Sequence, residues 1–168
     1  MNKRILYWDN LKGVLILLVV FGHSIEFFID KYVIFKNLWL IIYSFHMPLF
    51  IFMNGIFLKK YNIHKKNKKI KKLFTLYFIL QAILSLIYCL FNSNVAYSLF
   101  YPPFGLWYII FLCYAILISS FVGKENRLVW LISSIILSLT IGIDGQLINA
   151  FAVSKFLFYL PFFILGYA

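Results

Sequence analysis

Charged residues are scarce in this 168-residue sequence. They make up 12% of it, whereas a soluble domain usually contains about 25% charged and about 45–50% apolar residues. Hydrophobic residues instead reach 64% and aromatic residues 21%. A chain of this length cannot enclose a core large enough to bury so much apolar surface. The composition therefore excludes a soluble domain and predicts an integral membrane protein in contact with the lipid bilayer.

Cysteine is rare, and the sequence also lacks a cleavage signal. Cys89 and Cys113 lie in apolar runs with no nearby His and no metal-ligand spacing, so we interpret them as structural and expect no metal site. No small-residue cleavage pattern follows the apolar run after Lys3 and Arg4. We therefore expect this run to be retained as the first span.

The basic charge is concentrated in one place. The net charge is +11, and eight of the sixteen Lys and Arg lie in the segment 59–72, between two apolar runs. Basic loops between spans are typical of membrane proteins, whereas a nucleic-acid site shows a basic patch or stripe on a folded domain. We expect no nucleic-acid partner. We expect this lysine segment to set the topology and contact anionic lipids, with a ligand site as the alternative.

Apolar runs close to the roughly 20 residues that cross a bilayer predict an all-α bundle of about six transmembrane helices. We expect spans at residues 10–29, 38–58, 73–91, 104–122, 128–143 and from 156 onward, with the lysine segment as a loop. The sequence shows neither an internal repeat nor a domain boundary, so residues 1–168 are predicted to form one domain. The last run stops about thirteen residues in, which predicts a truncated chain.

The distribution of Lys and Arg predicts the orientation, because cytoplasmic loops carry an excess of both. If the lysine segment is cytoplasmic, the N-terminus and the turn at 123–127 lie on the same side. That side then holds thirteen of the sixteen basic residues. We therefore expect a multi-pass membrane protein with a cytoplasmic N-terminus.

The first span carries ionisable residues that a lipid-facing helix would not carry. Lys12 and His23 are eleven residues apart, which places them within about 20° on one helix face and about 16 Å apart along the axis. Glu26 follows His23 at i+3, where side chains are neighbours. Ionisable groups inside a span usually mark a functional site. Asp9 and Lys12, also three apart, form either part of that site or an ion pair at the helix mouth.

The second span adds another imidazole. His46 lies about 12 Å into this span, at a depth that His23 could share. As a lone imidazole it is either a functional group or a hydrogen-bond partner for a neighbouring helix. Pro48 removes one backbone N–H and favours a kink, while Asn54 and Gly55 supply a polar group and a site of close helix approach.

Five short segments form a recognisable pattern. They are Asp9-x-Leu11-Lys12-Gly13, His23-Ser24, Ser44-Phe45-His46-Met47-Pro48-Leu49-Phe50 with Asn54-Gly55, Gly105-Leu106-Trp107-Tyr108, and Leu160-Pro161-Phe162-Phe163-x-Leu165-Gly166-Tyr167. In this order they resemble the membrane acyltransferase-3 family, and most of all its fucose 4-O-acetylase-like branch of sugar acetyltransferases. The wider family has Arg at the position of Lys12, Ser at that of Asn54 and Pro at that of Leu76.

The resemblance implies an enzyme, an acyltransferase that transfers groups other than amino-acyl groups. Its members move an acyl group, usually acetyl, from cytoplasmic acetyl-CoA to a carbohydrate hydroxyl of an envelope or exported glycan. It also implies a bacterial plasma-membrane location and a fold of about ten spans of roughly 20 residues each. The present chain would then be the N-terminal half of that fold.

The ionisable residues suit this chemistry. A sugar hydroxyl attacks well only when its proton is removed in the transition state, and His is the commonest base. We expect burial to keep His23 neutral and Glu26 to orient its ring. Lys12, beside Asp9, is expected to attract the phosphates of CoA as a point charge. The sequence leaves three roles for His46: a second base, an oxyanion donor or a relay for a covalent acyl intermediate.

Two functions of other classes also fit the sequence. One is a proton-coupled transporter or flippase subunit in which Lys12, His23 and Glu26 form a proton relay; transport that does not depend on acetyl-CoA would favour it. The other is an inactive truncated fragment, which acetyl-CoA binding by the 168-residue chain would argue against. The sequence makes no prediction of oligomeric state.

Overall fold

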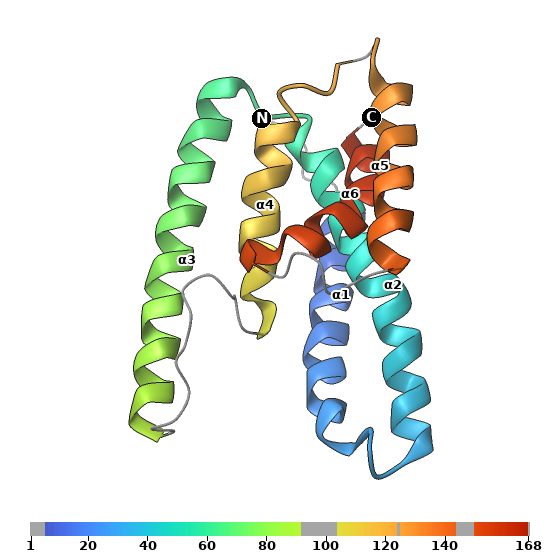
Figure 1. The fold of residues 1–168 in the computed structure, drawn as a ribbon, viewed down its shortest axis with the longest axis vertical. Helices are drawn as coiled ribbons and strands as arrows, with labels where there is room; N and C mark the ends of the chain where they lie inside the picture. The colour runs from blue at the N-terminus through green and yellow to red at the C-terminus, as the bar shows by residue number, and fades with distance from the viewer. Residues whose placement is uncertain (1–5, 92–103, 124, 144–149, 168) are drawn as a thin grey trace. The chain divides into compact units, whose positions relative to one another are not determined.

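The structure, a computed structural model, describes residues 6–91, 104–123, 125–143 and 150–167. All regular structure in these ranges is helical (Figure 1), so the predicted all-α class is confirmed. The elements are α1 (Leu6–Ile25), η1 (Glu26–Phe28), α2 (Val33–Leu58), α3 (Ile63–Phe91), η2 (Phe104–Leu106), α4 (Trp107–Ile118), α5 (Arg127–Ile143), η3 (Ala150–Ala152) and α6 (Val153–Tyr167).

Three of the helical segments are long and apolar enough to cross a bilayer. They are Leu6–Phe28, Val33–Leu58 and Ile63–Ile87, with 23, 26 and 25 residues. The helices α4, α5 and α6 are apolar and lie where spans are expected, but they have 12, 17 and 15 residues, fewer than the roughly 20 of a complete crossing. Length therefore supports three of the six predicted spans in the described part of the chain.

The lysine segment is mostly helical, so its prediction as a loop is wrong. Helix α3 begins at Ile63, because the side-chain oxygen of Asn62 accepts a hydrogen bond from the backbone N–H of Lys65 at 3.0 Å and caps the helix. Lysine has a high helix propensity, so a run of positive charge does not stop a helix. The apolar pattern predicts the start of the hydrophobic span at residue 73, but the helix itself begins ten residues earlier, at Ile63.

Similar differences occur at two other boundaries. Helix α2 starts at Val33, five positions before the predicted span, and it continues without interruption past Pro48 to Leu58. Helix α4 ends at Ile118, four positions before the predicted end of its span. Beyond it, Asn126 accepts from the Gly123 N–H at 2.7 Å and donates to a backbone carbonyl at 3.0 Å, which confirms the predicted turn.

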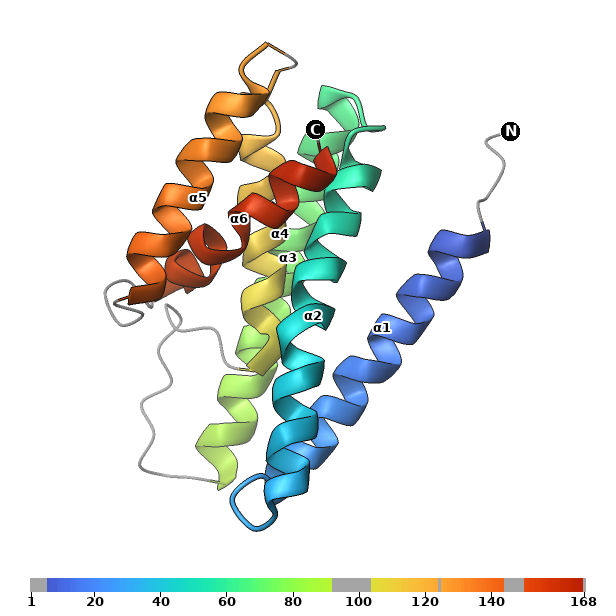
Figure 2. The ribbon, with the colours of Figure 1, turned by 90° about the vertical axis from the view of Figure 1, so that its right-hand side faces the viewer.

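The chain divides into two compact units, Met1–Met53 and Asn54–Ala168, with the division inside α2. In the first unit, α1 turns through η1 into the start of α2. In the second, α4 contacts both α3 and α6, and α6 lies along α5 (Figure 2). The assignment of all 168 residues to one domain stays a prediction.

The core of the second unit lies around α4 and α6. Tyr77, Leu106 and Ile110 form one buried cluster. Phe111 and Phe163 are both completely buried, with ring centroids 6.5 Å apart. This core consists of large apolar and aromatic side chains that pack between helices.

One residue of the lysine segment belongs to this unit's interior. Lys66 is 6% exposed, and its ammonium group donates to the Tyr167 hydroxyl at 3.1 Å and to the Ser119 carbonyl at 3.5 Å. The Tyr167 hydroxyl donates to the same Ser119 carbonyl at 2.9 Å. Since Ser119 caps the C-terminus of α4, a positive charge there also complements the helix dipole.

Candidate functional site

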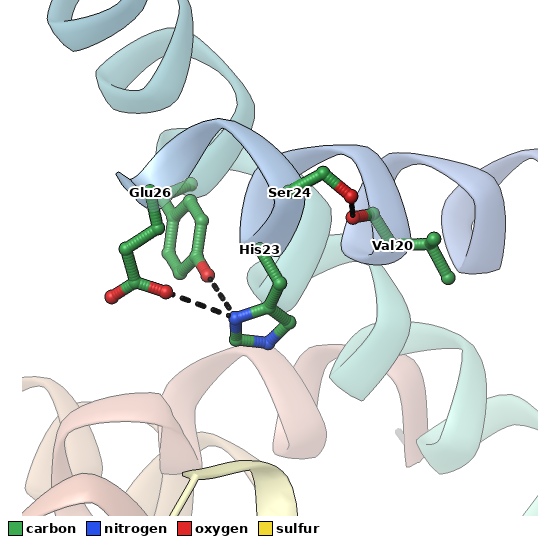
Figure 3. Close-up of polar contacts among 5 residues, drawn as sticks. Val20, His23, Ser24 and Glu26 are labelled. Carbon is green, nitrogen blue, oxygen red and sulfur yellow. Dashed lines mark hydrogen bonds and ion pairs between the residues drawn. The ribbon is translucent and has the colours of Figure 1, made fainter. Parts of the chain in front are cut away.

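The predicted pair in the first span is in contact. His23 lies in the last turn of α1 and Glu26 begins η1. The Nδ1 atom of His23 is 3.2 Å from Oε2 of Glu26 (Figure 3). The i+3 spacing therefore places the carboxylate against the ring, as expected from the sequence.

A third side chain reaches the same ring nitrogen. The hydroxyl of Tyr43, on α2, lies 3.2 Å from Nδ1 of His23, and the two rings meet edge to face with centroids 6.0 Å apart. The dashed lines in Figure 3 show the carboxylate and the tyrosine hydroxyl converging on one nitrogen. Ser24 faces back along α1, because its hydroxyl donates to the Val20 carbonyl at 2.8 Å.

This arrangement indicates the tautomer of the imidazole. An ionised carboxylate only accepts hydrogen bonds, so a contact with Glu26 requires the proton to be on Nδ1. The lone pair of neutral His23 then lies on Nε2, the second ring nitrogen, which Figure 3 shows on the far side of the ring from Glu26. Nε2 is therefore the atom that can accept a proton from a substrate.

His23 is less buried than the sequence suggested. Its side chain is 46% exposed and that of Glu26 is 50% exposed, so the expected burial of His23 is wrong for the described part of the chain. The buried stripe of α1 consists of Leu15, Gly22 and Ile25, and His23 lies at the edge of that stripe. Part of its side chain is exposed, and its Nδ1 atom contacts Tyr43 of α2.

The other predicted imidazole is fully enclosed. His46 is 1% exposed, and its Nδ1 lies 2.6 Å from the carbonyl oxygen of Ile42. A carbonyl only accepts, so Nδ1 donates and Nε2 carries the lone pair in neutral His46. The His46 ring meets the Tyr43 ring edge to face, with centroids 4.7 Å apart. Tyr43 thus contacts both imidazoles.

Sequence reasoning missed Tyr43, although the sequence contains a signal for it. Trp39, Tyr43 and His46 are spaced i, i+4 and i+7 and so share one face of α2. The Trp39 and Tyr43 rings are stacked, with centroids 4.2 Å apart and 25° between their planes. Taken as one stripe, the three residues would have marked the side of α2 that meets His23.

Lys12 and Asp9 lie toward the other end of α1. The helix is continuous from Leu6 to Ile25, which is the condition for Lys12 and His23 to share a face. Lys12 and Asp9 are both half-buried, and the Asp9 carboxylate acts electrostatically on Lys12. The structure therefore places these two residues about three turns from the imidazole site, in a separate position along the helix.

Two further predicted residues lie at the start of the second unit. The Asn54 side-chain amide donates to the Tyr108 hydroxyl of α4. Gly55 faces the backbone of α6, where a Cβ atom would lie 2.5 Å from the Phe163 carbonyl oxygen. The predicted roles of a polar contact and a close helix approach are both confirmed. No group of three or more His, Cys, Asp or Glu with metal-binding geometry occurs among the described residues.

Comparison with known proteins gives one extensive match and one short match. A family model described as an acyltransferase domain matches residues 5–168. The nodulation protein NolL of Sinorhizobium fredii (strain NBRC 101917 / NGR234) is 44% identical over 59 residues, which are 32% of this chain and 16% of that protein. The chain thus matches only a small part of that relative's length. No solved structure matches.

Proposed function

This chain belongs to the acyltransferase family whose model matches residues 5–168, and we propose that it acts as a membrane O-acyltransferase. The donor is cytoplasmic acyl-CoA, with acetyl as the acyl group, and the acceptor is a carbohydrate hydroxyl of an envelope or exported glycan. Three long apolar helices and the family support a membrane protein. We place it in the bacterial plasma membrane with a cytoplasmic N-terminus, following the asymmetry of Lys and Arg.

The contact between Glu26 and His23 carries this proposal. In acyl transfer, Nε2 of His23 takes the proton of the acceptor hydroxyl while its oxygen forms a bond to the acyl carbonyl carbon. The thioester C–S bond then breaks, and the CoA thiolate receives the proton from His23. The products are the O-acyl sugar and CoA with a free thiol. The distance of 3.2 Å between Nδ1 and Oε2 supports Glu26 as the group that holds the ring and stabilises the imidazolium.

His46 has a narrower set of roles than the sequence alone allowed. With Nδ1 committed to the Ile42 carbonyl at 2.6 Å, neutral His46 offers a lone pair at Nε2 and no further N–H. An oxyanion donor needs an N–H, so this geometry favours a second base or a nucleophilic relay.

Lys12 and Asp9 suit the donor end of the reaction. With the proposed orientation, both lie near the cytoplasmic surface, from which CoA arrives. The Lys12 ammonium supplies a positive charge for the CoA phosphates, and the Asp9 carboxylate interacts electrostatically with it. The donor would enter at this end of α1, and the acyl carbon would react near His23.

The test is the variant His23→Ala in the complete protein in its native membrane, assayed for transfer of radiolabelled acetyl from acetyl-CoA to glycan. We expect a loss of about 100-fold or more, the size of a general-base contribution, with unchanged membrane insertion. The matched control is His64→Ala, because His64 is exposed on α3 and should be dispensable. Near-normal acetylation by His23→Ala would contradict the proposal.

A second candidate function is a proton-coupled transporter subunit. The observation that favours it is the cluster of Glu26, His23 and Tyr43, in which the carboxylate and the hydroxyl each lie 3.2 Å from Nδ1 of His23, because clustered ionisable groups in a membrane often belong to proton relays. Movement of a glycan across vesicle membranes in the absence of acetyl-CoA would support this function over acyl transfer.

A further inference from the structure

Tyr43 is held in place from three directions. Its ring stacks on Trp39 at 4.2 Å and meets His46 edge to face at 4.7 Å. On the α1 side, Gly22 leaves room for it, because a Cβ atom at that position would lie only 3.0 Å from Cε2 of Tyr43. The hydroxyl is therefore brought to Nδ1 of His23 by a packed aromatic ring.

The Tyr43 hydroxyl and the Glu26 carboxylate share one nitrogen. Each lies 3.2 Å from Nδ1 of His23, and this atom has at most one hydrogen to donate. If the Tyr43 O–H donated to Nδ1, the nitrogen lone pair would face the carboxylate oxygen, which is unfavourable. The favourable arrangement has N–H donated by Nδ1 toward both oxygens, as in three-centre hydrogen bonds.

We propose that Tyr43 is a positioning residue for His23, an inference that rests on the proposed acyl transfer. Its hydroxyl oxygen accepts from Nδ1–H together with Glu26, which keeps the proton on Nδ1 and the lone pair on Nε2. When Nε2 takes the proton of the acceptor hydroxyl, the imidazolium forms between two oxygen acceptors. The packed ring also fixes His23 at the level of His46.

The conservative variant Tyr43→Phe tests this proposal, because it removes the hydroxyl and keeps the ring. In the complete membrane protein with acetyl-CoA and glycan, we expect kcat to fall about tenfold, the effect of one hydrogen bond to a charged group. The KM values for both substrates should change less than about twofold, because the contact gains strength only when the imidazolium forms. A role in packing alone would leave kcat unchanged.

The control is Tyr32→Phe, whose ring packs on Phe35 and whose side chain is exposed; its kinetics should equal those of the wild type. An independent variant is Gly22→Ala, whose added methyl group would push against the Tyr43 ring and displace it. This variant should also lower kcat with little change in KM. In the His23→Ala background, Tyr43→Phe should cause no further loss of the residual rate, because Tyr43 acts through His23.

The outcomes separate this inference from the proposed function. If His23→Ala is inactive while Tyr43→Phe keeps the wild-type kcat, the role of Tyr43 is overturned and the acyl-transfer proposal stands. A further loss on adding Tyr43→Phe to His23→Ala would also overturn it, since Tyr43 would then act independently of His23. If His23→Ala itself remains active, the proposed base is wrong and the inference falls with it.

Discussion

Gly55 of α2 lies directly against the backbone of Phe163 in α6. A Cβ atom at Gly55 would be 2.5 Å from the Phe163 carbonyl oxygen and 2.6 Å from the Tyr167 amide nitrogen. Both neighbours are backbone atoms, which cannot rotate away as a side-chain end could. Small residues at helix interfaces allow this close approach in membrane proteins, so the packing of these two helices depends on the absence of a side chain.

We therefore predict that Gly55→Ala destabilises the protein. The added methyl group must push two helix backbones apart, and overpacking of this kind costs about 1–3 kcal/mol or more. Thermal unfolding in detergent should show a lower midpoint. The control is Gly13→Ala, because nothing lies within 4 Å of a Cβ at Gly13. That variant should be neutral or slightly stabilising, and an equal loss in both would disprove the role of close packing.

Tyr167→Phe should also destabilise the second unit. The change removes an acceptor at 3.1 Å from the buried Lys66 ammonium and a donor to the Ser119 carbonyl, which we expect to cost about 1–3 kcal/mol. Chemical or thermal unfolding measures the loss. In a Lys66→Met background the loss should be smaller, because no buried charge then lacks its partner.

The control for this variant is Tyr61→Phe. Tyr61 is exposed, and the Lys69 ammonium lies over its ring at 5.1 Å, a contact that phenylalanine retains. Unfolding of Tyr61→Phe should match that of the wild type. Equal stability of Tyr167→Phe and the wild type would show that the Lys66 contacts contribute nothing.

Glu26→Gln should lower kcat and leave membrane insertion unchanged. The amide keeps the size of the side chain but removes the negative charge beside Nδ1 of His23. Since the carboxylate is 50% exposed, we expect a loss on the order of 10- to 100-fold, below that of a buried triad carboxylate. The control is Glu125→Gln, an exposed residue in the turn before α5. An active Glu26→Gln enzyme would remove Glu26 from the mechanism.

Lys12→Gln should raise the KM for acetyl-CoA with little change in kcat. A point charge that attracts phosphates binds ground state and transition state equally, so its loss appears in KM. Steady-state kinetics over a range of donor concentrations measures this. The control is Lys36→Gln, because Lys36 is exposed near the start of α2. A fall in kcat without a change in KM would place Lys12 in the chemical step instead.

The sequence predicts the order of helices well, because apolar runs and turn residues are local signals. It also predicts the contact between His23 and Glu26, since an i+3 spacing on a helix needs no tertiary information. Helix ends were less predictable. Hydrophobicity indicates where the apolar span begins, which is residue 73. Helix α3 begins earlier, at Ile63, because lysine favours the helix as strongly as apolar residues do.

Tertiary relationships were harder to predict. Which of eight lysines is buried depends on Ser119 and Tyr167, which lie 53 and 101 positions away from Lys66. The role of Tyr43 depends on the register of α2 against α1, in which Gly22 leaves room for the Tyr43 ring. The partial exposure of His23 likewise depends on which residues of α1 face α2. The sequence of α1 alone does not determine which face packs against α2.

The seclusion of Lys66 changes how the lysine segment should respond to ionic strength. Seven of its lysines are at least partly exposed: Lys59, Lys60, Lys65, Lys68, Lys69, Lys71 and Lys72. We expect their ammonium groups to attract anionic headgroups, and concentrated salt screens such an attraction. The eighth ammonium sits among fixed dipoles and keeps its contacts in the same salt. High salt should therefore weaken the contact of this segment with lipid headgroups. The packing of α3, α4 and α6 around Lys66 should stay unchanged.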